Sequence, residues 1–160
     1  MISRQALRIS TVALTLFIAP ALLAIWAQPA VAQTESVIHN FTTGDGAIGP
    51  FANVIADSVG NLYGVAQSNT GGAVYELVRS LSGQWSLKIL YESRPSDNAG
   101  AYAGLTMDAA GNLYDVSTYG GSNGWGAVIE LQRISNGTWR QKTIYSFSDA
   151  ATDGHYPARV

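Results

Sequence analysis

The sequence contains one unit of about 50 residues twice, and this duplication constrains the fold more than any single residue does. The recurring segments are DSVGNLYGV (57–65) and DAAGNLYDV (108–116), GAVYEL (72–77) and GAVIEL (126–131), and GQWSLKILYES (83–93) and GTWRQKTIYSF (137–147). The offset rises from 51 to 54 along the unit, because the second copy has three extra residues in its loop YGGSNGWG. Surface loops absorb such insertions without disturbing the elements that they connect.

Each copy has four short runs of aromatic and β-branched residues separated by Gly, Asn, Ser or Asp, which predicts four strands. The predicted strands are 54–57, 61–66, 73–78 and 85–91 in the first copy (49–93), and 105–108, 112–117, 127–132 and 139–145 in the second (100–147). Short connections favour antiparallel pairing of consecutive strands. We therefore predict an all-β fold of four-stranded antiparallel blades in a β-propeller-like repeat.

The phase of the repeat predicts an incomplete ring of about two and a half blades. Residues 35–41 align with the last strand of each copy and are predicted to form a lone strand, while 148–160 begin a partial third repeat. Because propellers close with roughly four to eight blades, we expect an N-terminal part of a longer protein whose further repeats complete the ring. The alternative is a short chain that closes by self-assembly.

Residues 1–32 have the pattern of a secretory signal peptide. Arg4 and Arg8 precede an apolar run over 9–26, and the small residues of Ala-Val-Ala predict cleavage before Gln33. An uncleaved membrane anchor is the alternative, because the apolar run nearly reaches spanning length. Cleavage is favoured by the Ala-Val-Ala sequence, so we predict a secreted, periplasmic or cell-surface protein without a membrane span after cleavage.

Composition narrows the chemistry and the partners of the mature chain. The absence of Cys excludes disulfides and thiolate metal sites. Once Arg4 and Arg8 are removed, seven Lys and Arg stand against eleven Asp and Glu. This acidic balance disfavours nucleic acid and anionic lipid as partners, because both attract a basic surface.

The repeated D-x-x-G-N motif is predicted to shape a hairpin turn. Its residues are Asp57, Gly60 and Asn61 in the first copy and Asp108, Gly111 and Asn112 in the second. An Asp at the start of a turn accepts backbone N–H groups ahead of it, and Gly and Asn tolerate positive φ. A calcium loop would need several closely spaced oxygen ligands, whereas Ser-Val and Ala-Ala fill these positions. No metal and no cofactor is predicted.

The combination of AGLTMDAAGNLYDVS, GGSNGWGAVIELQ and GTWRQKTIYSF resembles the GloVer tandem repeat of bacterial secreted or surface proteins, and the resemblance covers residues 37–160. It implies a propeller-like fold and attachment to the cell surface, and it implies no reaction, cofactor or catalytic residue. The chain departs from the repeat at Asp115, where Gly is usual and Gly64 keeps it. A second departure is Asn53, where Gly104 is typical.

Two residues are candidates for ligand binding. Trp125 lies on the inserted Gly-rich loop, where an aromatic ring can stack on a sugar, and Asp115 breaks the pattern of its own repeat. Glu76 and Glu130 occupy equivalent positions, which favours a structural role for both. The partner of such a site is expected to be a carbohydrate or another surface protein.

Two functions follow from these features. A binding or scaffold module is favoured, so no catalytic residue is predicted. The alternative is an extracellular enzyme on a propeller fold that cleaves polysaccharides or lactones. Catalysis would require acids or histidines outside the repeat pattern to converge, and Asp115, Asp149 and His155 are the candidates.

Overall fold

The computed structural model of the chain describes residues 34–94, 103–149, 152–154 and 156–157. The predicted signal peptide and His155 lie outside the described residues. Residues Val37–Val160 form one compact unit, and the following concerns this unit alone.

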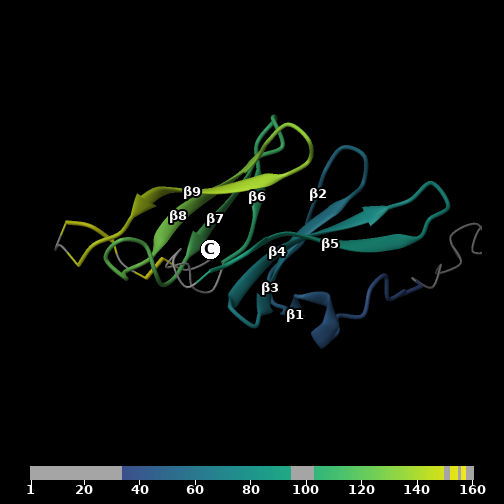
Figure 1. The fold of residues 1–160 in the computed structure, drawn as a ribbon, viewed down its shortest axis with the longest axis horizontal. Helices are drawn as coiled ribbons and strands as arrows, with labels where there is room; N and C mark the ends of the chain where they lie inside the picture. Colours follow the sequence, from purple (N-terminus) through teal and green to yellow (C-terminus); the bar gives the residue numbers. More distant parts are fainter. Residues whose placement is uncertain (1–33, 95–102, 150–151, 155, 158–160) are drawn as a thin grey trace, which may run out of the picture. The chain divides into compact units, whose positions relative to one another are not determined.

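The chain folds into two antiparallel sheets, one for each copy of the repeat (Figure 1). The first sheet contains β1 (Ile48–Pro50), β2 (Ile55–Ala56), β3 (Leu62–Ser68), β4 (Gly71–Arg79) and β5 (Trp85–Glu92), in the order β1-β3-β4-β5 with β2 also paired to β3. The second sheet contains β6 (Thr106–Met107), β7 (Leu113–Ser117), β8 (Ala127–Arg133) and β9 (Trp139–Ser146), in that order. A short 3-10 turn, η1 (Thr43–Asp45), precedes β1.

The all-β class and the antiparallel pairing of consecutive strands are confirmed, and each of the eight predicted repeat strands overlaps an observed one. The described residues do not close into a barrel or a propeller. The lone strand predicted at 35–41 is wrong, since these residues are irregular. A strand there would need the third strand of a repeat as its partner, but β4 is already paired with β5 and β8 with β9. Strand β1, which was not predicted, pairs with the C-terminal end of β3.

Each sheet has two distinct faces, because side chains alternate along a strand. We call one the leucine face; it consists of Leu62, Gly64, Tyr75 and Leu77 in the first sheet and Leu113, Asp115, Ile129 and Leu131 in the second. We call the other the valine face; it consists of Tyr63, Val65, Val74 and Glu76 in the first sheet and Tyr114, Val116, Val128 and Glu130 in the second. The equivalent residues are cross-strand neighbours in both sheets.

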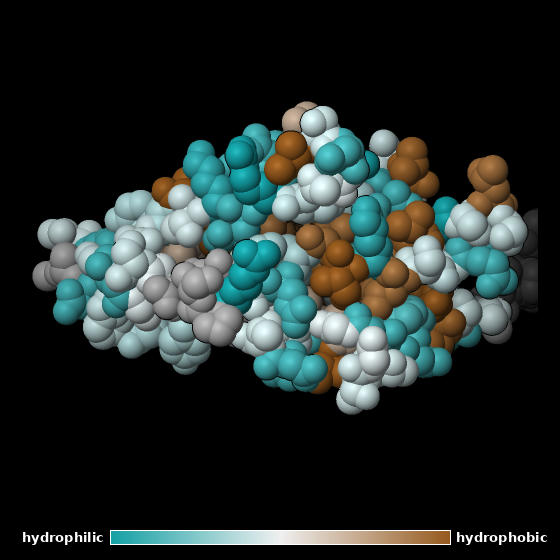
Figure 2. Space-filling view, viewed as in Figure 1, coloured by the Kyte–Doolittle hydropathy of each residue, from teal (hydrophilic) through white to brown (hydrophobic). Residues whose placement is uncertain are grey.

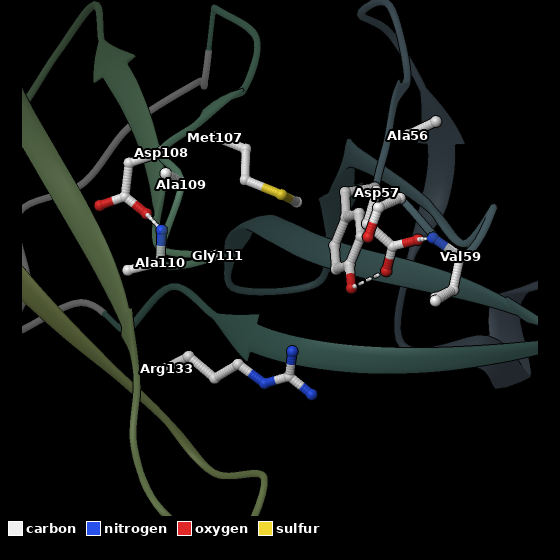
Figure 3. Close-up of a pocket in the computed structure, with 11 residues that line it drawn as sticks. Ala56, Asp57, Val59, Met107, Asp108, Ala109, Ala110, Gly111 and Arg133 are labelled. Carbon is white, nitrogen blue, oxygen red and sulfur yellow. Dashed lines mark hydrogen bonds between the residues drawn. The ribbon is translucent and has the colours of Figure 1, made fainter.

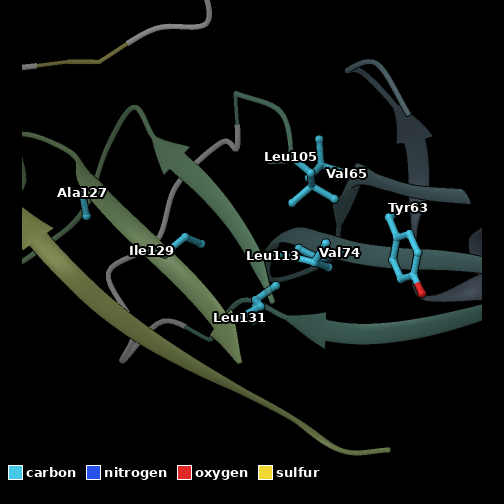
Figure 4. Close-up of a cluster of buried hydrophobic side chains, with 8 residues drawn as sticks. All are labelled: Tyr63, Val65, Val74, Leu105, Leu113, Ala127, Ile129 and Leu131. Carbon is cyan, nitrogen blue, oxygen red and sulfur yellow. The ribbon is translucent and has the colours of Figure 1, made fainter. Parts of the chain in front are cut away.

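The two sheets share one apolar core, shown in Figure 4. The valine face of the first sheet packs against the leucine face of the second, so unlike faces meet. The buried members of this core are Tyr63, Val65, Val74, Leu105, Leu113, Ala127, Ile129 and Leu131.

The leucine face of the first sheet is covered by the segment that precedes β1. Phe41 and the fully buried Ala47 pack there, and the Phe41 ring lies 5.0 Å from that of Tyr75. Figure 2 shows strongly apolar side chains over the first sheet and paler, more polar loops at the left. The valine face of the second sheet has no equivalent cover among the described residues.

Candidate functional site

In each D-x-x-G-N hairpin, both carboxylate oxygens of the aspartate accept hydrogen bonds from the hairpin itself. Asp57 Oδ1 accepts the N–H groups of Val59 and Asn61 at 3.0 and 2.9 Å, and Asp57 Oδ2 accepts the Asn61 side chain at 3.0 Å. Gly60 adopts φ 90°, a region that favours glycine. Burial opposes ionisation of Asp57, but hydrogen bonds from Asn61, Tyr63 and Val59 outweigh it and lower the pKa of the carboxyl. The second hairpin, with Asp108, Gly111 and Asn112, repeats this geometry.

A tyrosine links each turn to the interior of its sheet, which sequence reasoning missed. The Tyr63 hydroxyl lies 3.1 Å from Asp57 Oδ2 and 2.9 Å from Glu76 Oε1. Burial and the two acceptors raise the pKa of Tyr63 above its ordinary range. Tyr114 makes the equivalent bridge in the second copy. The repetition of Asp, Tyr and Glu was visible in the sequence, but their convergence required the register of three strands.

A cleft of about 510 Å³ lies between the two hairpins and is drawn in Figure 3. Asp57 and Asp108 line it, and the guanidinium of Arg133 extends into it. Arg133 also lies 6.0 Å over the Trp139 ring, as Arg79 lies over Trp85 in the first copy. Both carboxylates accept their full set of local donors, so neither is free to act as a base. The repetition of this arrangement favours a structural role.

Asp115 is buried within the second sheet. Its side chain is 3% exposed, and Oδ1 accepts N–H groups of Ala103, Gly104 and Val116 at 3.1, 3.0 and 2.6 Å. Oδ2 is buried and has no hydrogen-bond partner among the residues that the structure describes. Desolvation raises the pKa of the carboxyl to about 7, although the three N–H donors act in the opposite direction. Asp115 therefore anchors the chain entering β6 and is sealed from ligands.

The first copy has a different pair of residues at the equivalent positions. Gly64 replaces Asp115 there, and its cross-strand neighbour Tyr75 replaces Ile129. A Cβ at Gly64 would collide with the Tyr75 ring and hydroxyl. The smaller Ile129 leaves room for the Asp115 side chain. The departure of Asp115 from the repeat is thus one half of a paired exchange across two strands.

Trp125 belongs to an aromatic cluster at one end of the second sheet. The loop between β7 and β8 meets the segment after β9 there (Figure 1), and the Tyr156 N–H donates to the Trp125 carbonyl at 2.8 Å. The Tyr156 ring lies 5.0 Å from Trp125 and 5.6 Å from Tyr119. Tyr119 and Tyr156 were not predicted, because only the folded chain brings residue 156 to this loop.

The acids proposed for catalysis are not seen to converge. Asp115 is buried, whereas Asp149 is exposed, and His155 lies outside the described residues. Asp153 accepts hydrogen bonds from Ser148 and from the Tyr145 hydroxyl, which position the turn after β9. Among the described residues there is no cluster of three or more side chains suited to a metal ion.

Comparison of the chain with protein-family models, curated proteins and solved structures found no match. Within the part of the chain that the structure describes, no helix is long and apolar enough to cross a membrane.

Proposed function

We propose that this chain is a secreted or cell-surface β-propeller-like repeat protein that acts as a binding and scaffold module, and that its second sheet docks a further repeat. The observation that carries the proposal is the valine face of the second sheet. Residue for residue it repeats the valine face of the first sheet, which is buried at the contact between the sheets.

The difference in burial between the two copies supports this reading. Tyr63 is 2% exposed and Val65 and Val74 are fully buried, but their equivalents in the second copy are half-buried. On the last strand, Tyr145 is 47% exposed, whereas its equivalent in β5 is half-buried. Burying a valine or a larger apolar side chain contributes roughly 1.5–3 kcal/mol. The second copy keeps the side chains of a buried face, but no sheet among the described residues covers them as the second sheet covers the first.

A further repeat sheet suits this face better than the first sheet of another copy of the chain. The surface that buries a valine face in this fold is a leucine face. The leucine face of the first sheet is already covered by Phe41 and Ala47, so a second copy would have to displace this segment. The resemblance to the GloVer repeat supports the same partner and a location outside the cytoplasm.

A chain with a third repeat tests the proposal. Residues 94–147 are duplicated after Phe147, and Val128→Lys is introduced into the native and the extended chain. We expect the lysine to lower the free energy of unfolding much more in the extended chain, because only there does a leucine face cover Val128. Val74→Lys is the matched control, since Val74 is buried in both chains.

Urea unfolding of the four variants and their parents measures the difference. Equal effects of Val128→Lys in the two chains would show that this face does not dock a repeat. The location is tested separately, by sequencing the N-terminus of the protein exported by a bacterial host. Hydrolysis of polysaccharides or lactones by the purified chain would favour the enzyme instead.

A further inference from the structure

Three aromatic rings gather at the surface beside the loop that distinguishes the second copy from the first, two from the loop itself and one from the segment after β9. Tyr119 is 57% exposed and Tyr156 is 43% exposed, and the half-buried Trp125 lies in contact with Tyr156. The equivalent loop of the first copy, SNTGG at 68–72, is shorter and has no aromatic residue. The repeat alone therefore does not require these rings. Loops held on a rigid scaffold are the usual carriers of binding residues.

The loop is tightly fixed around the cluster. The Gly126 N–H donates to the Gly120 carbonyl at 3.0 Å, and a Cβ at Gly126 would collide with Pro157. The buried Ser117 hydroxyl donates to the Tyr119 carbonyl, which fixes the backbone of that residue. A surface held in one arrangement binds a ligand with a smaller loss of conformational entropy.

The backbone of Tyr156 is strained in a way that places its ring in the cluster. Its φ is 50°, in the left-handed region that a bulky residue rarely adopts. The hydrogen bond from its N–H to the Trp125 carbonyl holds this conformation. Such strain persists where the surrounding structure enforces it, and it is concentrated at functional sites.

The arrangement of the rings limits the class of ligand. Tyr156 lies only 5.0 Å from Trp125 and 5.6 Å from Tyr119, so the rings touch one another and leave no space between them. A cage that surrounds a quaternary ammonium would need such a space. The rings are inclined to one another by 63° and 58°, and Tyr119 and Tyr156 are exposed, so they present separate ring surfaces on which successive rings of a partly apolar chain ligand can stack.

The charges of the two segments that form the cluster disfavour anions. The segments 117–126 and 146–157 contain no Lys or Arg and carry two aspartates. The same loop contributes the exposed Ser122 and Asn123, which offer hydroxyl and amide groups beside the rings. A sugar ring presents C–H groups to an aromatic face and hydroxyls at its edge. A neutral sugar therefore matches the surface in both respects.

We propose that Tyr119, Trp125 and Tyr156 form a stacking surface for the pyranose rings of a neutral polysaccharide. This site is separate from the valine face of the second sheet, so it adds a ligand-binding function to the proposed scaffold.

Affinity electrophoresis and pull-down of the full chain test the proposal. The probes are cellulose, chitin, xylan and a β-1,3-glucan, with polygalacturonate as the anionic comparison. Binding of tetramethylammonium, monitored by tryptophan fluorescence, tests whether the cluster instead binds a quaternary ammonium cation. We expect retention by at least one neutral polysaccharide, and we expect Tyr119→Ala and Trp125→Ala to weaken it by about tenfold each. Tyr119→Phe retains the ring and should retain binding.

Phe51→Ala is the matched control, because Phe51 is a similarly exposed aromatic residue, at 40%, on the first copy. Tyr119→Ala keeps the test valid even if Trp125→Ala disturbs the loop. The proposal is overturned if no neutral polysaccharide is retained, if only polygalacturonate or tetramethylammonium binds, or if Phe51→Ala weakens binding equally. Val128→Lys should leave sugar binding unchanged, so the failure of one site is distinguishable from failure of the other.

Discussion

Asp115 should make the stability of this protein depend on pH in a range where few side chains titrate. Desolvation raises the pKa of the folded carboxyl to about 7, while N–H groups of Gly104, Val116 and Ala103 oppose the shift. In the unfolded chain the carboxyl returns to its ordinary value of 3.8. Between these two values the folded state binds a proton that the unfolded state has released.

The sign and the size of the effect follow from these two pKa values. Because the folded pKa is the higher one, the stabilisation by the neutral acid is complete below the unfolded pKa. It declines as the pH rises and is lost above the folded pKa, near 7. Each pKa unit corresponds to about 1.4 kcal/mol. The free energy of unfolding should therefore fall by about 4 kcal/mol across this window through Asp115 alone.

The comparison uses Asp115→Asn, which keeps the shape of the side chain and an oxygen for the N–H donors but does not titrate. Urea unfolding of both proteins between pH 4 and pH 8 gives the pH-dependent difference, and subtraction removes the contributions of all other groups. Asp149→Asn, at an exposed acid, is the control for removing a carboxyl group from the surface. The carboxyl carbon-13 resonance of Asp115 should titrate near pH 7.

The reasoning is refuted if the wild type and Asp115→Asn give parallel curves. It is also refuted if the Asp115 resonance titrates near pH 4, since Oδ2 would then have a partner that compensates for its burial.

Two further predictions concern the packing inside the first sheet. Gly64→Ala should lower the free energy of unfolding by about 1–3 kcal/mol, because its Cβ would collide with Tyr75. Adding Tyr75→Ile should recover the lost stability, as measured by urea unfolding. If it does not, the interpretation of Gly64 and Tyr75 as a paired exchange is contradicted. Tyr63→Phe should lower the free energy of unfolding by about 1 kcal/mol, because its hydroxyl bridges two carboxyl groups in the interior. The same change at the half-buried Tyr114 should have a smaller effect, and equal losses would argue against burial as the cause.

The strands were predictable because the repeat supplied two independent readings of each. Turn residues marked the same boundaries in both copies, and β-branched and aromatic runs filled the intervals, so the predicted strand at 73–78 matches β4 and that at 127–132 matches β8 closely. Such signals are local. The lone strand predicted at 35–41 failed because a strand also depends on an unpaired partner, and both third strands of the repeats, β4 and β8, already pair with their own fourth strands, which periodicity does not report.

The candidate sites were less predictable, because they depend on contacts between distant segments. Trp125 was conspicuous in its glycine-rich loop, yet the position of Tyr156 beside it depends on how the chain returns after β9. Asp115 was visible as a departure from the repeat. Its compensation by Ile129 in place of Tyr75 becomes evident only when the strand register is known.

The unlike faces of the sheets give any stack of these repeats a direction. A contact between two different surfaces is not self-complementary, so it continues head to tail until a ring closes or a terminus blocks it. In the proposed stack, the segment with Phe41 and Ala47 blocks the leucine face of the first sheet. Further repeats would then add only at the second sheet.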